Sequence, residues 1–127
     1  LLGSVLRSES GAVPKAKSHT EEDAVACYRN YSSNDCIIVE DIYSALRASE
    51  YMNAVALLGT NLNASRVNNI KQQQFSRVFL ALDADVFDKV IEYVATYRSV
   101  LRMQPVKLTM DLKNMNNEQL KEFFDVL

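Results

Sequence analysis

The chain has 127 residues, of which 48% are hydrophobic and 24% are charged, with only three glycines and two prolines. This composition excludes disordered and collagen-like classes and is typical of one globular domain with a buried core. The net charge of −2 comes from 14 basic and 16 acidic residues, so the overall charge does not indicate a nucleic-acid-binding protein. An acidic protein can still bind nucleic acid where a metal ion and local lysines supply a positive field.

The cysteines and the apolar segments indicate the cellular compartment that we expect for the protein. Cys27 and Cys36 lack the spacing of a metal site, and we expect them to be reduced thiols in the cytoplasm. No apolar stretch approaches the length of a membrane span, and no signal peptide is visible. Because the chain begins at Leu1, we expect it to be a fragment of a longer protein.

Residues 1–30 differ in pattern from the rest of the chain. Extended and turn-forming patterns within residues 1–19 predict the remnant of a β-hairpin. Acidic residues at 21–23 predict a short helix that reaches Tyr28. The polar loop that follows predicts a domain boundary, with residues 1–30 as an upstream segment and 31–127 as the main domain.

From Cys36 onward, strand and helix patterns alternate. We expect strands at 36–39, 54–58, 78–82 and 105–110, and helices at 42–48, 63–74, 86–101 and from 116 onward. Ala45 and Leu46 are expected on the inner side of the first of these helices. Four strand–helix alternations predict an α/β fold, a compact parallel sheet of about four strands flanked by helices.

Acidic residues follow two of the buried strands. Glu40 ends the first apolar run, and Asp83 and Asp85 end the run at 78–82. Since ligands collect outside the carboxyl ends of parallel strands, we expect these three carboxylates to converge there. Hard oxygen ligands without His or Cys favour Mg²⁺ or Mn²⁺. Helix capping is the alternative interpretation, because Asp85 directly precedes an amphipathic helix.

The same segments resemble a known family. Val39-Glu40, Leu57-Leu58-Gly59-Thr60 and Leu82-Asp83-Ala84-Asp85 are similar, in order and spacing, to the motifs of the Toprim domain shared by bacterial-type primases, topoisomerases and small nucleases. The Leu-Gly-Thr element, with Arg7, Gly11 and Pro14-Lys15 upstream, looks most like a bacterial or phage primase.

The resemblance implies a function. Glu40, Asp83 and Asp85 would be catalytic and would hold Mg²⁺ or Mn²⁺, while Arg7, Lys15 and Lys17 would bind nucleotide or nucleic acid. The activity would be RNA primer synthesis from nucleoside triphosphates on a single-stranded DNA template, with a replicative helicase as a partner and no role for a membrane.

Departures from the primase pattern leave alternatives open. Asp41 stands where primases carry glycine, Ser44 replaces an expected aspartate, and an acidic pair after the last strand is reduced to Asp111. Asp41, Asp88 and Asp111 could supply replacement oxygens or serve as helix caps and surface charges. These changes favour a phage or plasmid primase over a cellular one. A Toprim nuclease and a degenerate Toprim scaffold are the competing interpretations.

Overall fold

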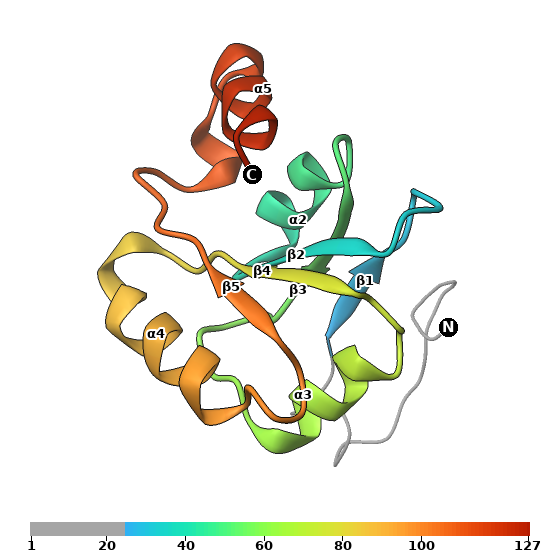
Figure 1. The fold of residues 1–127 in the computed structure, drawn as a ribbon. Coiled ribbons are helices and arrows are strands. Elements are labelled where there is room, and N and C mark those ends of the chain that lie inside the picture. Colours follow the sequence, from blue (N-terminus) through green and yellow to red (C-terminus); the bar gives the residue numbers. More distant parts are fainter. Residues whose placement is uncertain (1–24) are drawn as a thin grey trace.

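A five-stranded sheet between two layers of helices forms the body of the molecule in the computed structural model, which describes residues 25–127 (Figure 1). The strands are β1 (Ala26–Tyr28), β2 (Asp35–Val39), β3 (Asn53–Ala56), β4 (Arg77–Leu80) and β5 (Met103–Pro105), in the spatial order β1-β3-β2-β4-β5. Strands β2, β3, β4 and β5 run parallel to one another, and β1 pairs antiparallel with β3. The predicted α/β fold with four parallel strands is confirmed, whereas the predicted hairpin in residues 1–19 lies outside the described residues.

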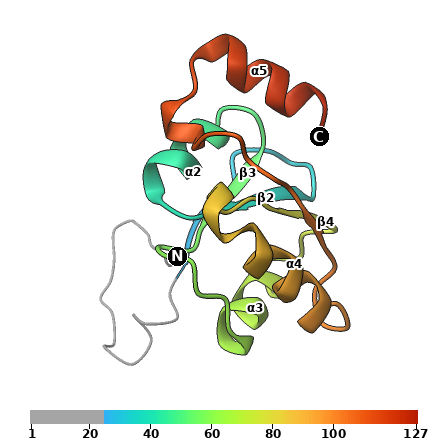
Figure 2. The same ribbon diagram turned by 90° about the vertical axis from the view of Figure 1, so that its left-hand side faces the viewer.

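Helices cover both faces of the sheet (Figures 1 and 2). They are α2 (Ile42–Ala48), α3 (Ala64–Lys71), α4 (Phe87–Thr96) and α5 (Asn117–Asp125), with the short 3₁₀-helices η1 (Ala84–Val86) and η2 (Leu112–Asn114). Helices α2 and α5 pack on one face, and α3 and α4 pack on the other. The sheet therefore has one hydrophobic core on each side.

The central strand β2 explains this arrangement. Ile37 and Ile38 are both 0% exposed, and their side chains enter the cores on opposite faces because successive residues of a strand point in opposite directions. A strand buried on both faces needs a continuous apolar run, which is the pattern of residues 36–39.

Two predicted elements at the edges of the sheet were wrong. The helix expected to reach Tyr28 is instead strand β1, whose register pairs Cys27 with Val55. The last strand begins earlier than expected, at Met103, and ends at Pro105 rather than continuing to Met110. Pairing with β4 at Val78, Phe79 and Leu80 fixes these bounds, and the half-exposed pattern of residues 105–110 did not reveal that pairing.

Two expected helix positions also differ. Ala45 is buried as predicted, but Leu46 is 44% exposed, and Ala48 is the second buried hydrophobic residue of α2. Helix α4 ends at Thr96, and Leu101 is buried from the loop that follows it. The boundary predicted near residue 30 stays a prediction, although β1 lies before it and belongs to the same sheet.

Both cysteines are free thiols, one in the edge strand β1 and one in the central strand β2. Cys27 lies in β1 and Cys36 is buried in β2, and burial raises the pKa of each thiol. Raised thiol pKa values make both residues poor nucleophiles.

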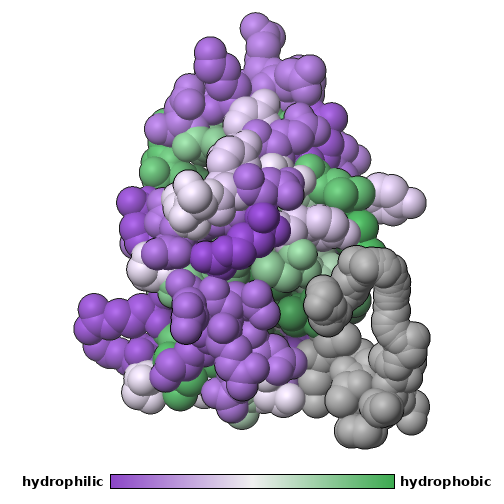
Figure 3. Space-filling view, turned by 90° about the vertical axis from the view of Figure 1, so that its right-hand side faces the viewer, coloured by the Kyte–Doolittle hydropathy of each residue, from purple (hydrophilic) through white to green (hydrophobic). Residues whose placement is uncertain are grey.

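The surface on the side of β1 is mostly hydrophilic, with separate hydrophobic patches (Figure 3). Within residues 25–127, none of the helices combines the length and the apolar character needed to cross a bilayer.

Candidate metal-binding site

The adjacent strands β2 and β4 lead to helices on opposite faces of the sheet. Strand β2 is followed by α2 on one face, and β4 is followed by η1 and α4 on the other. Chain segments that leave neighbouring parallel strands in opposite directions open a crevice at the carboxyl ends of those strands, which is where open α/β sheets bind ligands.

Glu40 and Asp83 lie just beyond the carboxyl ends of these two strands. Strands β2 and β4 are in register at Ile38 and Leu80, and the pairing continues with a 2.8 Å hydrogen bond from the Ala81 N–H to the Ile38 carbonyl. Two residues further on, Glu40 is level with Leu82, the residue that precedes Asp83. The strand register therefore sets these two acidic residues side by side.

Asp83 has the most perturbed carboxyl group of the site. Burial, a hydrogen bond to the Asp111 carboxyl and the charge of Glu40 together raise the pKa of Asp83 to about 7. Two carboxyl groups can share a hydrogen bond only when one carries a proton. Near neutral pH, Asp83 is consequently divided between its protonated and ionised forms, close to two further acids.

Asp111 reaches the site from the other end of the chain. It occupies the N-cap position of η2, but its side chain makes no capping hydrogen bond. The carboxyl group is left to contact Asp83 instead. The sequence offers several possible replacement ligands, and Asp111 is one of them. Its position after the last strand is the feature that distinguishes it from the others.

Glu40 is held by its backbone and carries an unpartnered side-chain atom. Its carbonyl accepts hydrogen bonds from the N–H groups of Leu58 and Gly59, at 2.8 and 3.1 Å. Leu58 has a φ of +63°, a strained conformation for a branched residue, and Gly59 follows at +146°. The Oε1 atom of Glu40 is buried without a hydrogen-bond partner.

The loop beside Glu40 is braced by α4. The Tyr93 hydroxyl donates to the Thr60 carbonyl at 3.1 Å, and the Tyr97 hydroxyl donates to the Leu62 carbonyl at 3.4 Å. The residues of the Leu-Gly-Thr element thus connect the carboxyl end of β2 to the opposite layer of helices.

Among residues 25–127, no three His, Cys, Asp or Glu side chains are arranged as a ready metal-binding group. This agrees with the contacts of Asp83, because carboxyl groups that hydrogen-bond to one another direct their oxygens at each other, whereas metal ligands direct them at a shared point. The chemistry of the donors nevertheless suits a hard cation: Asp83 contacts the carboxyl groups of Glu40 and Asp111, and one buried oxygen of Glu40 lacks a partner.

The remaining predicted site residues lie in different places. Asp85 is exposed in η1, and it is not among the groups that raise the pKa of Asp83. It does not cap α4 either, because Val86 occupies that N-cap position without a side-chain hydrogen bond. Arg7, Lys15 and Lys17 lie outside the described residues.

Asp41 does cap a helix. Its side chain accepts a 2.7 Å hydrogen bond from the Ser44 N–H at the start of α2 and also contacts Lys113. Partial burial opposes ionisation of Asp41, but the bonds from Ser44 and Lys113 outweigh it and lower the pKa of Asp41. Asp41 is therefore ionised at neutral pH and acts as the N-cap of α2.

Two hollows in the described surface lie away from this edge of the sheet. One, of about 460 Å³, is lined by residues of α5 and the segment before it, including Thr109, Met115 and Phe123. The other, of about 630 Å³, lies between α4 and the amino ends of β4 and β5 and includes Arg77, Arg98 and Arg102. Neither of these two hollows is lined by Glu40, Asp83 or Asp111.

Comparison with known proteins finds a similar fold. No family model matches the sequence, and no curated protein sequence matches it. The structure is similar to a crystal structure of the Aquifex aeolicus primase that comprises its zinc-binding and RNA polymerase domains, with a TM-score of 0.64 and 19% sequence identity. The match covers 96% of this chain and 35% of that chain. The chain therefore has a primase-like fold and spans about a third of the primase chain that it resembles.

Proposed function

We propose that this chain is the metal-binding part of a primase-type nucleotidyltransferase, and that Glu40, Asp83 and Asp111 hold Mg²⁺ or Mn²⁺. The observation that supports this most directly is the meeting of three carboxyl groups at the switch between β2 and β4, with an unpartnered buried oxygen on Glu40. The similarity of the fold to a primase structure supports the same proposal. Asp85 would contribute from the rim of the site.

A divalent cation suits these residues because it replaces the proton that the acids otherwise share. When bound, it would neutralise the charge of a nucleoside triphosphate and of the leaving pyrophosphate during nucleotidyl transfer. The protein would contribute the position of the carboxylates, set by the register of β2 and β4, and the exclusion of water from the buried side of Glu40.

The rest of the proposed activity extends beyond the described residues. Arg7, Lys15 and Lys17 would contact the phosphates of the incoming nucleotide or of a single-stranded DNA template. RNA primer synthesis on that template, with a replicative helicase as a partner, is the reaction that we assign to the whole protein. A phage or plasmid origin, in a cytoplasmic setting, fits the departures of the sequence from the primase pattern.

Titration with Mn²⁺ by isothermal calorimetry tests the proposal. We expect the wild-type chain to bind Mn²⁺ and Asp83→Ala to bind it at least about tenfold more weakly, since it loses a charged ligand. Glu118→Ala, which removes an exposed acid in the first turn of α5, is the matched control and should leave binding unchanged.

Three results would contradict the proposal. Wild-type protein that binds no Mn²⁺, or Asp83→Ala protein that binds it as tightly as wild type, would remove the metal site. Nicking of plasmid DNA in Mn²⁺ without added nucleotides would assign the same carboxylates to a nuclease.

A further inference from the structure

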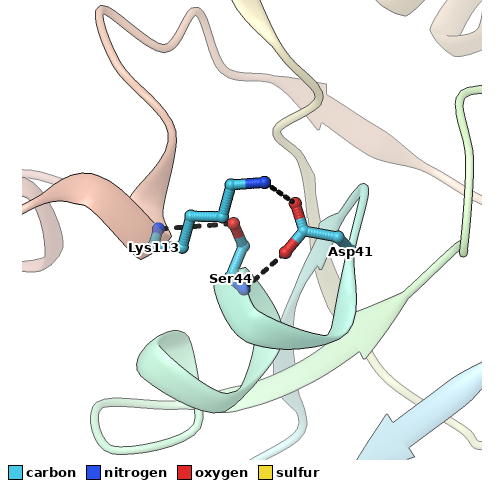
Figure 4. A network of polar contacts seen from close by, with 3 residues as sticks. All are labelled: Asp41, Ser44 and Lys113. Atoms are coloured by element: carbon cyan, nitrogen blue, oxygen red, sulfur yellow. Dashed lines mark hydrogen bonds and ion pairs between the residues drawn. The ribbon is translucent and has the colours of Figure 1, made fainter.

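A polar contact joins the two loops that carry Glu40 and Asp111 (Figure 4). The Lys113 Nζ atom donates to Asp41 Oδ2 at 3.1 Å, and the Lys113 backbone N–H donates to the Ser44 Oγ atom at 3.3 Å. Asp41 also caps α2 through the Ser44 N–H at 2.7 Å. One side chain thereby connects η2 to the first turn of α2.

The partners of this contact are close in sequence to the candidate ligands. Asp41 directly follows Glu40, and Lys113 lies two residues after Asp111. The ion pair therefore links the carboxyl end of β2 to the segment that delivers the third carboxylate. A movement that separates the two loops would stretch the Asp41–Lys113 contact, so the contact opposes separation of Glu40 and Asp111.

Apolar packing and polar contacts together position the 3₁₀-helix η2. It has only three residues, and its internal hydrogen bonds reach only from Asn114 to Asp111 and from Met115 to Leu112. Leu112 is fully buried and Met115, at the end of η2, is also buried in the core beneath α2, so apolar packing fixes η2 to the sheet. Hydrogen bonds that join Lys113 and Met115 to α2 add polar contacts to this packing.

Helix α2 provides the second contact as well. The Arg47 Nη2 atom donates to the Met115 carbonyl at 2.8 Å and to Asn117 Oδ1 at 3.3 Å. Lys113 is thus held at the first turn of α2, and the end of the same segment is held at its last turn. The direction of the segment that begins at Asp111 follows the axis of α2.

We infer that the Asp41–Lys113 ion pair is a clamp that sets the separation of the Glu40 and Asp111 carboxylates. This inference rests on the proposed metal site and assigns two positioning residues to it. Neither Asp41 nor Lys113 binds the ion: Asp41 is engaged by Ser44 and Lys113, and an ammonium group cannot be a ligand.

A clamp and a simple charge effect predict opposite results for Lys113→Met. Lys113 places a positive charge beside three carboxyl groups, so its removal by electrostatics alone would tighten the binding of a cation. Loss of a clamp would weaken binding, because residues that orient metal ligands typically contribute about 10- to 100-fold to affinity. The sign of the change therefore separates the two roles.

Mn²⁺ calorimetry on four variants of the full chain tests the clamp. We expect Lys113→Met to bind Mn²⁺ roughly tenfold more weakly than wild type and Lys113→Arg to restore most of that loss, since arginine keeps the ion pair. Asp41→Asn, which preserves a good N-cap but not the charge, should weaken binding similarly. Lys121→Met, the same charge change on the exposed face of α5, should have no effect.

Hydrogen exchange provides a readout that needs no metal. The Lys113 amide donates to Ser44 Oγ, so its exchange should accelerate in Asp41→Asn and Lys113→Met and stay unchanged in Lys121→Met. Equal or tighter Mn²⁺ binding by Lys113→Met, or unchanged exchange at Lys113, would overturn the clamp. If wild-type protein bound no Mn²⁺, the proposed function would fail, and the exchange measurement would still decide whether the contact holds η2.

Discussion

Asp83 is the residue whose surroundings in the folded protein lower stability when its carboxyl group ionises. Its carboxyl group is partly buried beside Asp111 and Glu40, and these surroundings raise its pKa from 3.8 to about 7. The folded state therefore binds a proton more tightly than the unfolded state does. This contribution favours folding at low pH and is lost as the pH rises through the interval between those two values. The negative charges of a cation-binding site repel one another, so such a site tolerates its own ionisation poorly.

Asp83→Asn should consequently stabilise the protein at alkaline pH. An amide of the same shape cannot ionise, and it can donate hydrogen bonds to the neighbouring carboxylates. The full pKa shift would correspond to about 4 kcal/mol, which we reduce to about 1–2 kcal/mol because the group is partly exposed to solvent. We expect that gain at pH 8 and almost none at pH 4, measured by urea unfolding in the absence of divalent ions.

Asp85→Asn is the matched control for this measurement. It removes an acid from the same loop, but Asp85 is exposed and does not contribute to the raised pKa of Asp83. Its effect should stay within about 0.5 kcal/mol at both pH values. A gain for Asp85→Asn equal to that for Asp83→Asn would show that overall charge, and not the local cluster, governs the result.

At the level of the elements, α2, α3 and α5 each begin at a side-chain N-cap. Helix α5 has a complete capping box, in which Asn116 accepts from the Gln119 N–H at 2.8 Å and Gln119 accepts from the Asn116 N–H at 2.9 Å. The helix then buries Leu120 and stacks Phe124 on Tyr51 with ring centroids 4.9 Å apart. The cap sets the start of α5, and these contacts fix its inner face.

Asn116→Ala should destabilise the protein by about 1 kcal/mol, because alanine cannot replace the side-chain acceptor of an N-cap. Asn68→Ala is a suitable comparison, since Asn68 is exposed inside α3, where alanine is the better helix former. Thermal unfolding followed by circular dichroism would detect both changes. A loss of stability in Asn68→Ala as large as that in Asn116→Ala would contradict the role of the cap.

The sequence predicts the elements whose pattern is local and misses those that depend on tertiary pairing. The buried runs before Glu40 and Asp83 identify β2 and β4, and Asn63 and Asn116 mark the starts of α3 and α5. Strand β1 was missed because its three residues are stabilised by pairing with β3, which nothing in the local sequence indicates.

The candidate site could also be predicted only where it depends on local sequence patterns. The meeting of Glu40 and Asp83 follows from two strand ends on one edge of a sheet. The approach of Asp111 does not, because it depends on the docking of η2 through Lys113 and Arg47. Asp41, which departs from the primase pattern, is used in that docking.

For the molecule as a whole, the two cores share one sheet. Ile37 contributes to the core beneath α2 and α5, and Ile38 contributes to the core beneath α3 and α4. Since both side chains belong to one strand, a loss of packing on either face weakens the same backbone. The two layers should therefore unfold together.

Ile37→Ala and Ile38→Ala should each cost about 2–5 kcal/mol, with a single unfolding transition in both variants. Urea unfolding followed by tyrosine fluorescence and by far-UV circular dichroism would test this, with Leu46→Ala as an exposed control. Transitions that differ between the two probes would indicate that the layers are independent.

Strand β5 is an edge strand of the sheet, and its last residue affects whether a further strand can pair with that edge. The neighbouring Val106 N–H donates to the Leu80 carbonyl at 3.0 Å, so at Pro105, one residue earlier, the backbone nitrogen faces away from β4. Proline has no proton to offer there. A strand from a second molecule would find one donor missing from a border only three residues long, which protects this flank against self-association into extended aggregates.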